Sequence, residues 1–125
     1  MMSIKYGWFE ISNGIMFFTY KKGLNLNLKA ATELVKKRLE ISKGHKYPAV
    51  IDTEGVNTID KSARDYLGSK KSQQGLRAAA FLCKSFYATV LTNFFLNLTS
   101  PTRNIPAKIF RDKKKALRWL EKYKS

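Results

Sequence analysis

The sequence predicts an α/β fold in which an N-terminal β-hairpin precedes alternating helices and strands. We expect a mixed five-stranded sheet covered by four helices. Three observations lead to this expectation: an Asn13-Gly14 turn, two continuous short apolar runs, and several segments with apolar residues at helical spacing. The chain has 125 residues, of which 44% are hydrophobic, and this composition predicts a single domain over residues 1–125.

The hairpin is expected at residues 8–12 and 15–20, where aromatic and β-branched side chains are concentrated. Asn13 and Gly14 separate the two runs. Both residues tolerate the positive φ angles of a type I′ turn, so they favour a tight connection between antiparallel strands.

A first helix is expected from about residue 28 to residue 42, with Gly44 available for a left-handed cap. Its inward positions are Leu28, Ala31, Leu34, Val35 and Leu39. Two opposite-charge pairs four residues apart indicate its solvated face: Glu33 with Lys37, and Lys36 with Glu40.

The two continuous apolar runs, residues 47–52 and 78–83, are expected to be central buried strands. A loop over residues 53–57 follows the first run, and Thr58 or Asp60 can cap a second helix. The inward positions of that helix are Ile59, Ala63, Tyr66 and Leu67.

After the second buried run we expect a third helix at about residues 87–98, a fifth strand at residues 105–110, and a last helix capped by Asp112. Because strands alternate with helices after the hairpin, the crossovers should be right-handed and much of the sheet should be parallel. The inward positions of the last helix are Ala116, Leu117 and Leu120.

The third helix carries more apolar surface than one buried face requires, in Phe86, Tyr87, Phe94, Phe95 and Leu96. Exposed apolar patches of this size tend to be contact sites. Two interpretations remain open: a second subunit (a homodimer) or another protein covers this surface, or the sheet and the last helix cover it entirely.

The chain is strongly basic, with 24 Lys and Arg against 9 Asp and Glu and a formal net charge of +15. Most of the excess lies after residue 60. Such a field attracts nucleic acid and anionic membrane surfaces, whereas the alternative is a solvated surface that only keeps the protein soluble. The candidate polyanion-binding side chains are Lys113, Lys114, Lys115, Arg118 and Lys122.

Residues 51–63 resemble the STAS domain, the SpoIIAA-like fold of bacterial anti-sigma factor antagonists. In that family a strand ends in Asp, and an apolar residue, Asp, two Ser and Gly follow at the start of a helix. The matching residues here are Asp52, Gly55, Val56, Ile59, Asp60 and Ser62. The sequence departs from the motif at Lys61, which replaces the first Ser, and at Ala63, which replaces the Gly.

Almost the whole chain also resembles an uncharacterised family of STAS-like proteins from Bacteroidetes-type bacteria. The resemblance implies a fold but no activity. It lies in Tyr47-Pro48, Ala63-Arg64-Asp65-Tyr66-Leu67, Asn93-Phe94-Phe95-Leu96 and Lys108-Ile109-Phe110. The architecture also resembles the lipid-binding CRAL-TRIO domain, although 125 residues leave little room for a lipid cavity.

The resemblance to anti-sigma factor antagonists implies a non-catalytic protein-interaction module in bacterial regulation. It places the regulatory phosphorylation site at Ser62, at the start of a helix where an anion is favoured. The alternative is an unmodified serine in the first helical turn. The candidate site comprises Asp60, Lys61, Ser62 and Arg64, with a partner loop at Glu54, Gly55 and Asn57.

No enzyme, cofactor or metal site is expected. His45 has no marked partner to orient it as a general base, and Cys83 ends an apolar run where a small buried side chain is typical. Four carboxylates that could bind a hard cation are more typical of helix caps and charge balance: Asp52, Glu54, Asp60 and Asp65.

We expect a cytoplasmic protein. The N-terminal segment contains Glu10 and lacks the pattern of a signal peptide. Residues 86–98 are too few and too polar to cross a bilayer, and a single cysteine fits a reducing compartment.

Overall fold

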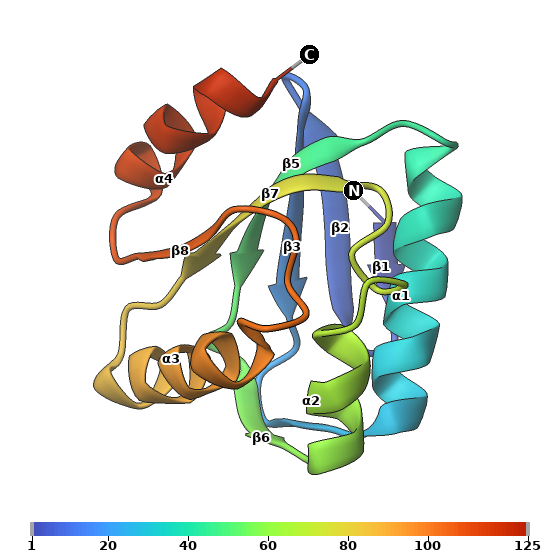
Figure 1. The fold of residues 1–125 in the computed structure, drawn as a ribbon, viewed down its shortest axis with the longest axis vertical. Coiled ribbons are helices and arrows are strands. Elements are labelled where there is room, and N and C mark those ends of the chain that lie inside the picture. Colours follow the sequence, from blue (N-terminus) through green and yellow to red (C-terminus); the bar gives the residue numbers. More distant parts are fainter. Residues whose placement is uncertain (1, 125) are drawn as a thin grey trace.

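The computed structural model describes residues 2–124 as a six-stranded sheet, a separate two-stranded sheet and four α-helices (Figure 1). A 3₁₀ turn, Glu121–Tyr123, follows the last helix. The elements in chain order are β1 (Met2–Ile4), β2 (Gly7–Ser12), β3 (Ile15–Tyr20), β4 (Leu24–Leu26), α1 (Leu28–Ser42), β5 (Tyr47–Asp52), β6 (Val56–Ile59), α2 (Lys61–Leu67), β7 (Leu76–Leu82), α3 (Phe86–Thr99), β8 (Ala107–Phe110) and α4 (Lys113–Leu120).

The main sheet has the strand order β1-β2-β3-β5-β7-β8. Its first three strands are antiparallel, and β3, β5, β7 and β8 are parallel, as expected from the alternation of helices and strands. The expectation of five strands is wrong, because β1 adds an antiparallel edge strand. The predicted loop after β5 also contains a short strand, since β6 pairs in parallel with β4.

The predicted hairpin is confirmed as β2 and β3. Asn13 has a φ of 51° and Gly14 a φ of 75°, the positive values that a type I′ turn requires. Ser12 consequently faces Ile15 in the register, and alternate side chains of β3 point to opposite faces of the sheet.

Each helix begins at a side chain that accepts a hydrogen bond from the first turn. Asp60 caps α2 by accepting from the backbone N–H of Ala63 at 2.8 Å, and Asp112 caps α4 in the same way. Asn27 and Ser85 cap α1 and α3.

The α1 helix differs from its predicted form in three details. The left-handed cap is Lys43, with a φ of 50°, although Gly44 next to it also has a positive φ. Leu28 is exposed at the first position of the helix. The predicted charge pairs do not form, since Lys37 pairs with Glu40 and Glu33 accepts from the Tyr6 hydroxyl.

The helices divide between the two faces of the main sheet. One face packs against α1, α2 and α3 and contains Phe9, Met16 and Phe18. The other face packs against α4 alone, with Leu120 and Ala116 fully buried over Val50 and Ala80. Trp119 of α4 lies beside Phe110 with a ring-centroid distance of 5.5 Å, so the α4 face also carries an aromatic border.

Candidate interaction surface

The loop after β5 is fastened to the start of α3 by Glu54. One carboxylate oxygen accepts from the backbone N–H of Lys84 at 2.7 Å and of Ser85 at 3.0 Å. Partial burial alone would raise the pKa of Glu54, but these hydrogen bonds and the Lys84 charge outweigh it and lower the pKa. The carboxylate therefore stays ionised at the positive end of α3.

The other two residues of the predicted partner loop also make internal contacts. Gly55 lies so close to the end of β3 that a Cβ atom would collide with the carbonyl oxygens of Tyr20 and Lys21. The carbonyl oxygen of Asn57 accepts from the Tyr87 hydroxyl of α3, and its amide donates to Asn25 at 3.0 Å. These residues position the loop against α3.

Ser62 is exposed in the first turn of α2, and its hydroxyl donates to the carboxylate of Asp60 at 3.0 Å. Lys61 is turned instead toward Asp65, with 2.8 Å between the charged atoms. The hydrogen bond from Lys61, together with its charge and that of Arg64, lowers the pKa of Asp65. The structure thus brings the predicted site residues together, with an acidic neighbour facing Ser62.

Arg64 connects this segment to α3. Its guanidinium lies over the ring of Phe94, 5.5 Å from the ring centroid, which is cation–π geometry. The outer side of α3 is strongly exposed, with Phe86 at 83% and Phe94 at 51% of full accessibility. We call this the α3 surface: Phe86, Tyr87, Val90, Phe94 and Leu98.

The α3 surface corrects one interpretation of the sequence, since the sheet and α4 do not cover it. Phe95 and Leu96 belong to the inner side of the helix, where they face the sheet. The α3 surface and the Glu54–Arg64 segment are continuous, because Tyr87 contacts Asn57 and Phe94 contacts Arg64.

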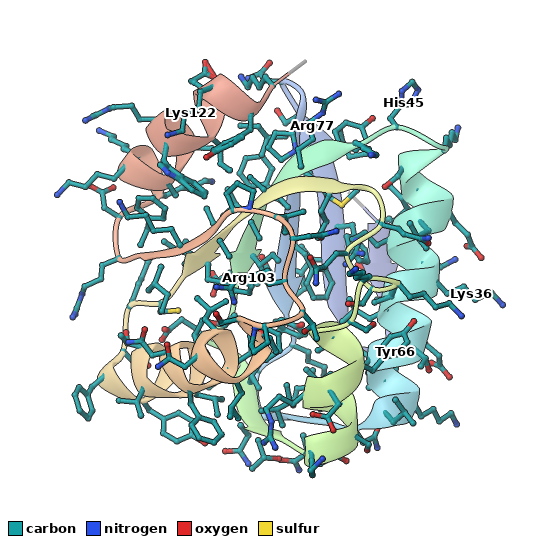
Figure 2. The ribbon with its side chains drawn as sticks, in the orientation of Figure 1. Lys36, His45, Tyr66, Arg77, Arg103 and Lys122 are labelled. Atoms are coloured by element: carbon teal, nitrogen blue, oxygen red, sulfur yellow. The ribbon has the colours of Figure 1, made fainter. Side chains whose placement is uncertain are left out.

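The basic side chains of the last helix lie elsewhere. Lys113, Lys114, Lys115 and Arg118 are exposed on α4, and Lys113 lies over the ring of Phe17 at 5.1 Å. Lys122 is not part of a regular helical stripe, because it lies in the 3₁₀ turn over Trp119 and Tyr123. Figure 2 shows Lys122 near one end of the molecule, away from Tyr66 of α2.

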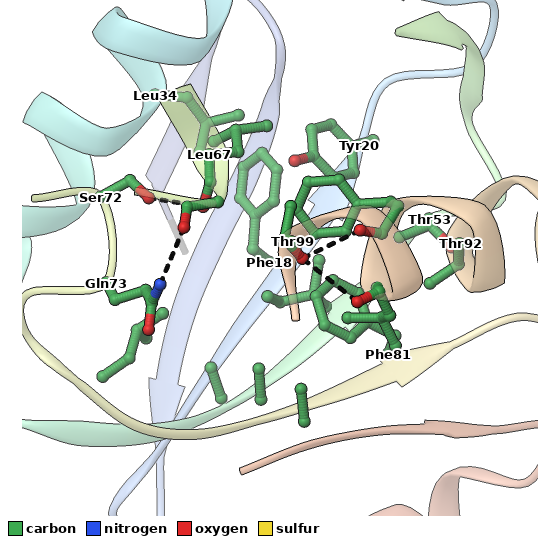
Figure 3. A pocket seen from close by; sticks show the side chains of 18 of the residues that line it. Phe18, Tyr20, Leu34, Thr53, Leu67, Ser72, Gln73, Phe81, Thr92 and Thr99 are labelled. Carbon is green, nitrogen blue, oxygen red and sulfur yellow. Dashed lines mark hydrogen bonds between the residues drawn. The ribbon is translucent and has the colours of Figure 1, made fainter. Parts of the chain in front are cut away.

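A cavity of about 120 Å³ lies between the sheet and helices α1, α2 and α3. Its wall is mostly apolar, with aromatic rings from the strands (Phe18, Phe81) beside aliphatic side chains of the helices (Leu34, Leu67) (Figure 3). Arg38 of α1 also lines it. Arg38 is not among the residues identified from the sequence alone. Its inward position could have been predicted from helical spacing, because it follows the inward residue Leu34 by four residues.

Two candidate residues of the sequence analysis remain, Cys83 and His45. Cys83 is fully buried and within hydrogen-bonding distance of Thr53 and Thr92, and His45 is exposed in the loop before β5. Within residues 2–124, His, Cys, Asp and Glu side chains form no group of three that could hold a metal ion. No helix in that range is both long and apolar enough to span a membrane.

The chain is similar to one protein family and to solved structures. A family model described as "Domain of unknown function (DUF7793)" matches residues 9–124. A solved structure from Shewanella loihica PV-4, described as an uncharacterized protein of the DUF3478 family with a SpoIIAA-like fold, is 20% identical and has a TM-score of 0.63. That match covers 96% of this chain and 98% of the Shewanella chain.

A protein of unknown function from Arthrobacter sp. FB24 is 23% identical, with a TM-score of 0.36, over 90% of this chain and 97% of that chain. None of the curated proteins matches the sequence. The Shewanella structure shows that the fold is SpoIIAA-like, which confirms the predicted fold class.

Proposed function

The chain belongs to the family described as "Domain of unknown function (DUF7793)", and we propose that it is a non-catalytic protein-interaction module of bacterial regulation. The observation that carries the proposal is the α3 surface, where five large apolar side chains lie exposed on one helix. Large exposed apolar patches are uncommon on monomeric proteins and favour a contact site. The SpoIIAA-like fold is compatible with this role.

The charges around the α3 surface indicate the chemistry of the partner. The helix itself contains no charged residue. Arg64 lies over Phe94, and the guanidinium of Arg111 donates to the carbonyl oxygen of Lys84 just before α3, so two cations lie beside the apolar centre, in addition to Glu54 at the start of the helix. An apolar patch with an acidic border is the complementary surface.

A partner of this kind is favoured over a second copy of the chain. A homodimer through α3 would bring together two copies of a chain whose net charge is +15. Like charges that face each other oppose association. The proposed partner is therefore a different, acidic protein with an apolar contact patch.

The resemblance to anti-sigma factor antagonists further supports Ser62 as a regulatory phosphorylation site. The Ser62 hydroxyl lies 3.0 Å from the carboxylate of Asp60, which also caps α2. A phosphate there would repel that carboxylate and disturb the α2 start. Arg64, two residues after Ser62, contacts Phe94 of α3, so modification would alter the border of the α3 surface.

The test compares the proteins that the wild type and its variants capture from a nuclease-treated lysate of the source organism, at low and at high salt. A discrete protein should remain bound to the wild type at high salt, because salt weakens polyanion contacts far more than a packed interface. The Phe94→Ser variant should lose it, with an affinity reduced by about 30-fold or more for a central aromatic contact. The Ser62→Asp variant should weaken the same complex.

The matched control is the double variant Lys114→Glu with Arg118→Glu on α4, which should bind that protein as the wild type does. If the Phe94→Ser variant still bound the captured protein at high salt, the proposal would be contradicted. A wild type that sediments as a dimer and a Phe94→Ser variant that sediments as a monomer would assign the α3 surface to a homodimer instead.

A second candidate function is polyanion binding by the exposed basic side chains of α4. The observation in its favour is that Lys114, Lys115 and Arg118 lie together on the outer side of one helix. The double variant Lys114→Glu with Arg118→Glu should abolish binding to nucleic acid and to anionic vesicles, and Ser62→Asp should leave it intact. Unchanged binding by the double variant would exclude this surface.

A further inference from the structure

The cavity between the sheet and helices α1, α2 and α3 combines an apolar wall with positive charge. Among the described residues that line it, two are arginines, Arg38 and Arg103, and none is Asp or Glu. The guanidinium of Arg103 donates to the carbonyl oxygen of Leu96 at 2.8 Å and is only half-buried. Arg38 is the more deeply placed charge.

Arg38 is a buried cation without a carboxylate partner among the described residues. It is only 8% exposed, and its Nη2 donates to the carbonyl oxygens of Ser72 and Gln74. Its Nε has no partner, and within residues 2–124 no other buried side-chain nitrogen or oxygen is left without one. A buried, unpaired charge is costly, so such groups usually pair with an opposite charge.

Arg38 nevertheless remains charged. Burial lowers its pKa to about 10, which still leaves the guanidinium protonated at neutral pH. The Tyr20 phenol lies on the same cavity wall, and burial raises its pKa to about 12. The neighbouring phenol therefore stays neutral and supplies no negative charge.

The size of the cavity restricts the ligand to a small molecule. Its volume is about 120 Å³. An apolar cavity of roughly 150 Å³ is sufficient to bind benzene. The volume is of the same order, so the space suits a body of about the size of one aromatic ring.

We propose that the cavity binds a small apolar carboxylic acid, whose carboxylate pairs with Arg38 and whose apolar body lies among Phe18, Leu34 and Phe81. A carboxylate matches the planar guanidinium of Arg38 in shape and charge. The contacts of Arg38 with Ser72 and Gln74 hold α1 to the α2–β7 loop. They use only Nη2 of the guanidinium and leave its charge without a carboxylate partner in the described part of the chain.

Calorimetric titration of the purified chain with three ring probes tests the charge requirement. Benzoate should bind at least about tenfold more tightly than benzyl alcohol, because hydrogen bonds to a charged group are stronger than neutral ones. Benzylammonium should not bind, since the cavity already carries cations. Absence of benzoate binding, or equal affinity for benzoate and benzyl alcohol, would overturn the proposal.

Two variants test the position of the ligand. Ala79→Leu directs a larger side chain from β7 into the cavity and should reduce benzoate affinity by about tenfold or more, without removing any polar group. Arg38→Met should abolish the preference for benzoate over benzyl alcohol while binding of the alcohol remains. A merely structural role of Arg38 would leave the preference unchanged in every folded variant.

The control is again the double variant Lys114→Glu with Arg118→Glu, which should bind benzoate as the wild type does, because α4 lies on the other face of the sheet. If Arg38→Met does not fold, the three probes and Ala79→Leu still decide the question. Unchanged benzoate affinity in the Ala79→Leu variant would place the ligand outside the cavity. Since purified protein is used, the result does not depend on the proposed protein partner.

Discussion

The two faces of the main sheet are packed in different ways. On the α4 face, Leu120 and Ala116 are fully buried, and the outer side of the helix is basic. On the opposite face, the helices enclose a cavity, and α3 leaves five large apolar side chains exposed. The apolar candidate binding features therefore concentrate around α3, whereas α4 closes the core on the other face and carries the basic side chains.

The difference follows from the residue patterns of the two helices. Apolar residues of α4 occur on one side, and lysines and an arginine occupy the rest, so one contact with the sheet buries all of the apolar side. Apolar residues of α3 occur all around the helix. A helix of that kind cannot bury its whole surface against one sheet, and the remainder stays available for a partner.

The largest expected effect compares Leu120 of α4 with Leu98 of α3. Leu120→Ala should lower the free energy of unfolding by about 2–5 kcal/mol, because it leaves a hole in a closed core. Leu98 is 48% exposed, so Leu98→Ala should change the free energy of unfolding by no more than about 0.5 kcal/mol. Urea unfolding measures both, and similar losses would mean that the two faces do not differ in packing.

The second largest expected effect compares substitutions at two adjacent alanines of β7 whose side chains point to opposite faces of the sheet. Ala80 is packed under α4, and Ala80→Leu should lower the free energy of unfolding by about 1–3 kcal/mol through overpacking. Ala79 lines the cavity, so Ala79→Leu should cost less or stabilise the fold. An equal loss at both positions in urea unfolding would show that the cavity cannot accept a larger side chain.

The smallest effect concerns Glu54, which holds the start of α3. Its pKa is lower in the folded chain than its usual value, so its stabilising contribution exists at neutral pH and disappears as pH falls through the folded pKa. Glu54→Gln should therefore be less stable than the wild type at pH 7, and the difference should shrink below the usual glutamate pKa of about 4.3. A difference that stays constant with pH, in thermal unfolding, would contradict this role.

Much of the fold could be predicted because strong local signals agree with the tertiary structure. The Asn13-Gly14 turn and the two apolar runs gave the hairpin and the central parallel strands. The strands β4 and β6 could not be predicted, since three or four residues carry no clear alternation and their pairing joins segments far apart in the chain.

The candidate site could be predicted only in part. Asp60 and Ser62 lie together because they are neighbours in sequence. The contacts of Glu54 with Lys84 and of Arg64 with Phe94 depend on how β5, β7 and α2 meet in space, which no local pattern encodes. The cavity and its unpaired Arg38 are properties of packing between three helices and a sheet.

The positions of the two tryptophans have a spectroscopic consequence. Trp119 lies on α4, and Trp8 of β2 alternates with Phe9, so its indole lies on the same side of the sheet as α4. Indole fluorescence therefore follows the docking of α4 without any added label. Neither tryptophan lines the cavity on the other face, so a change in indole fluorescence reports on the α4 face and not on filling of the cavity.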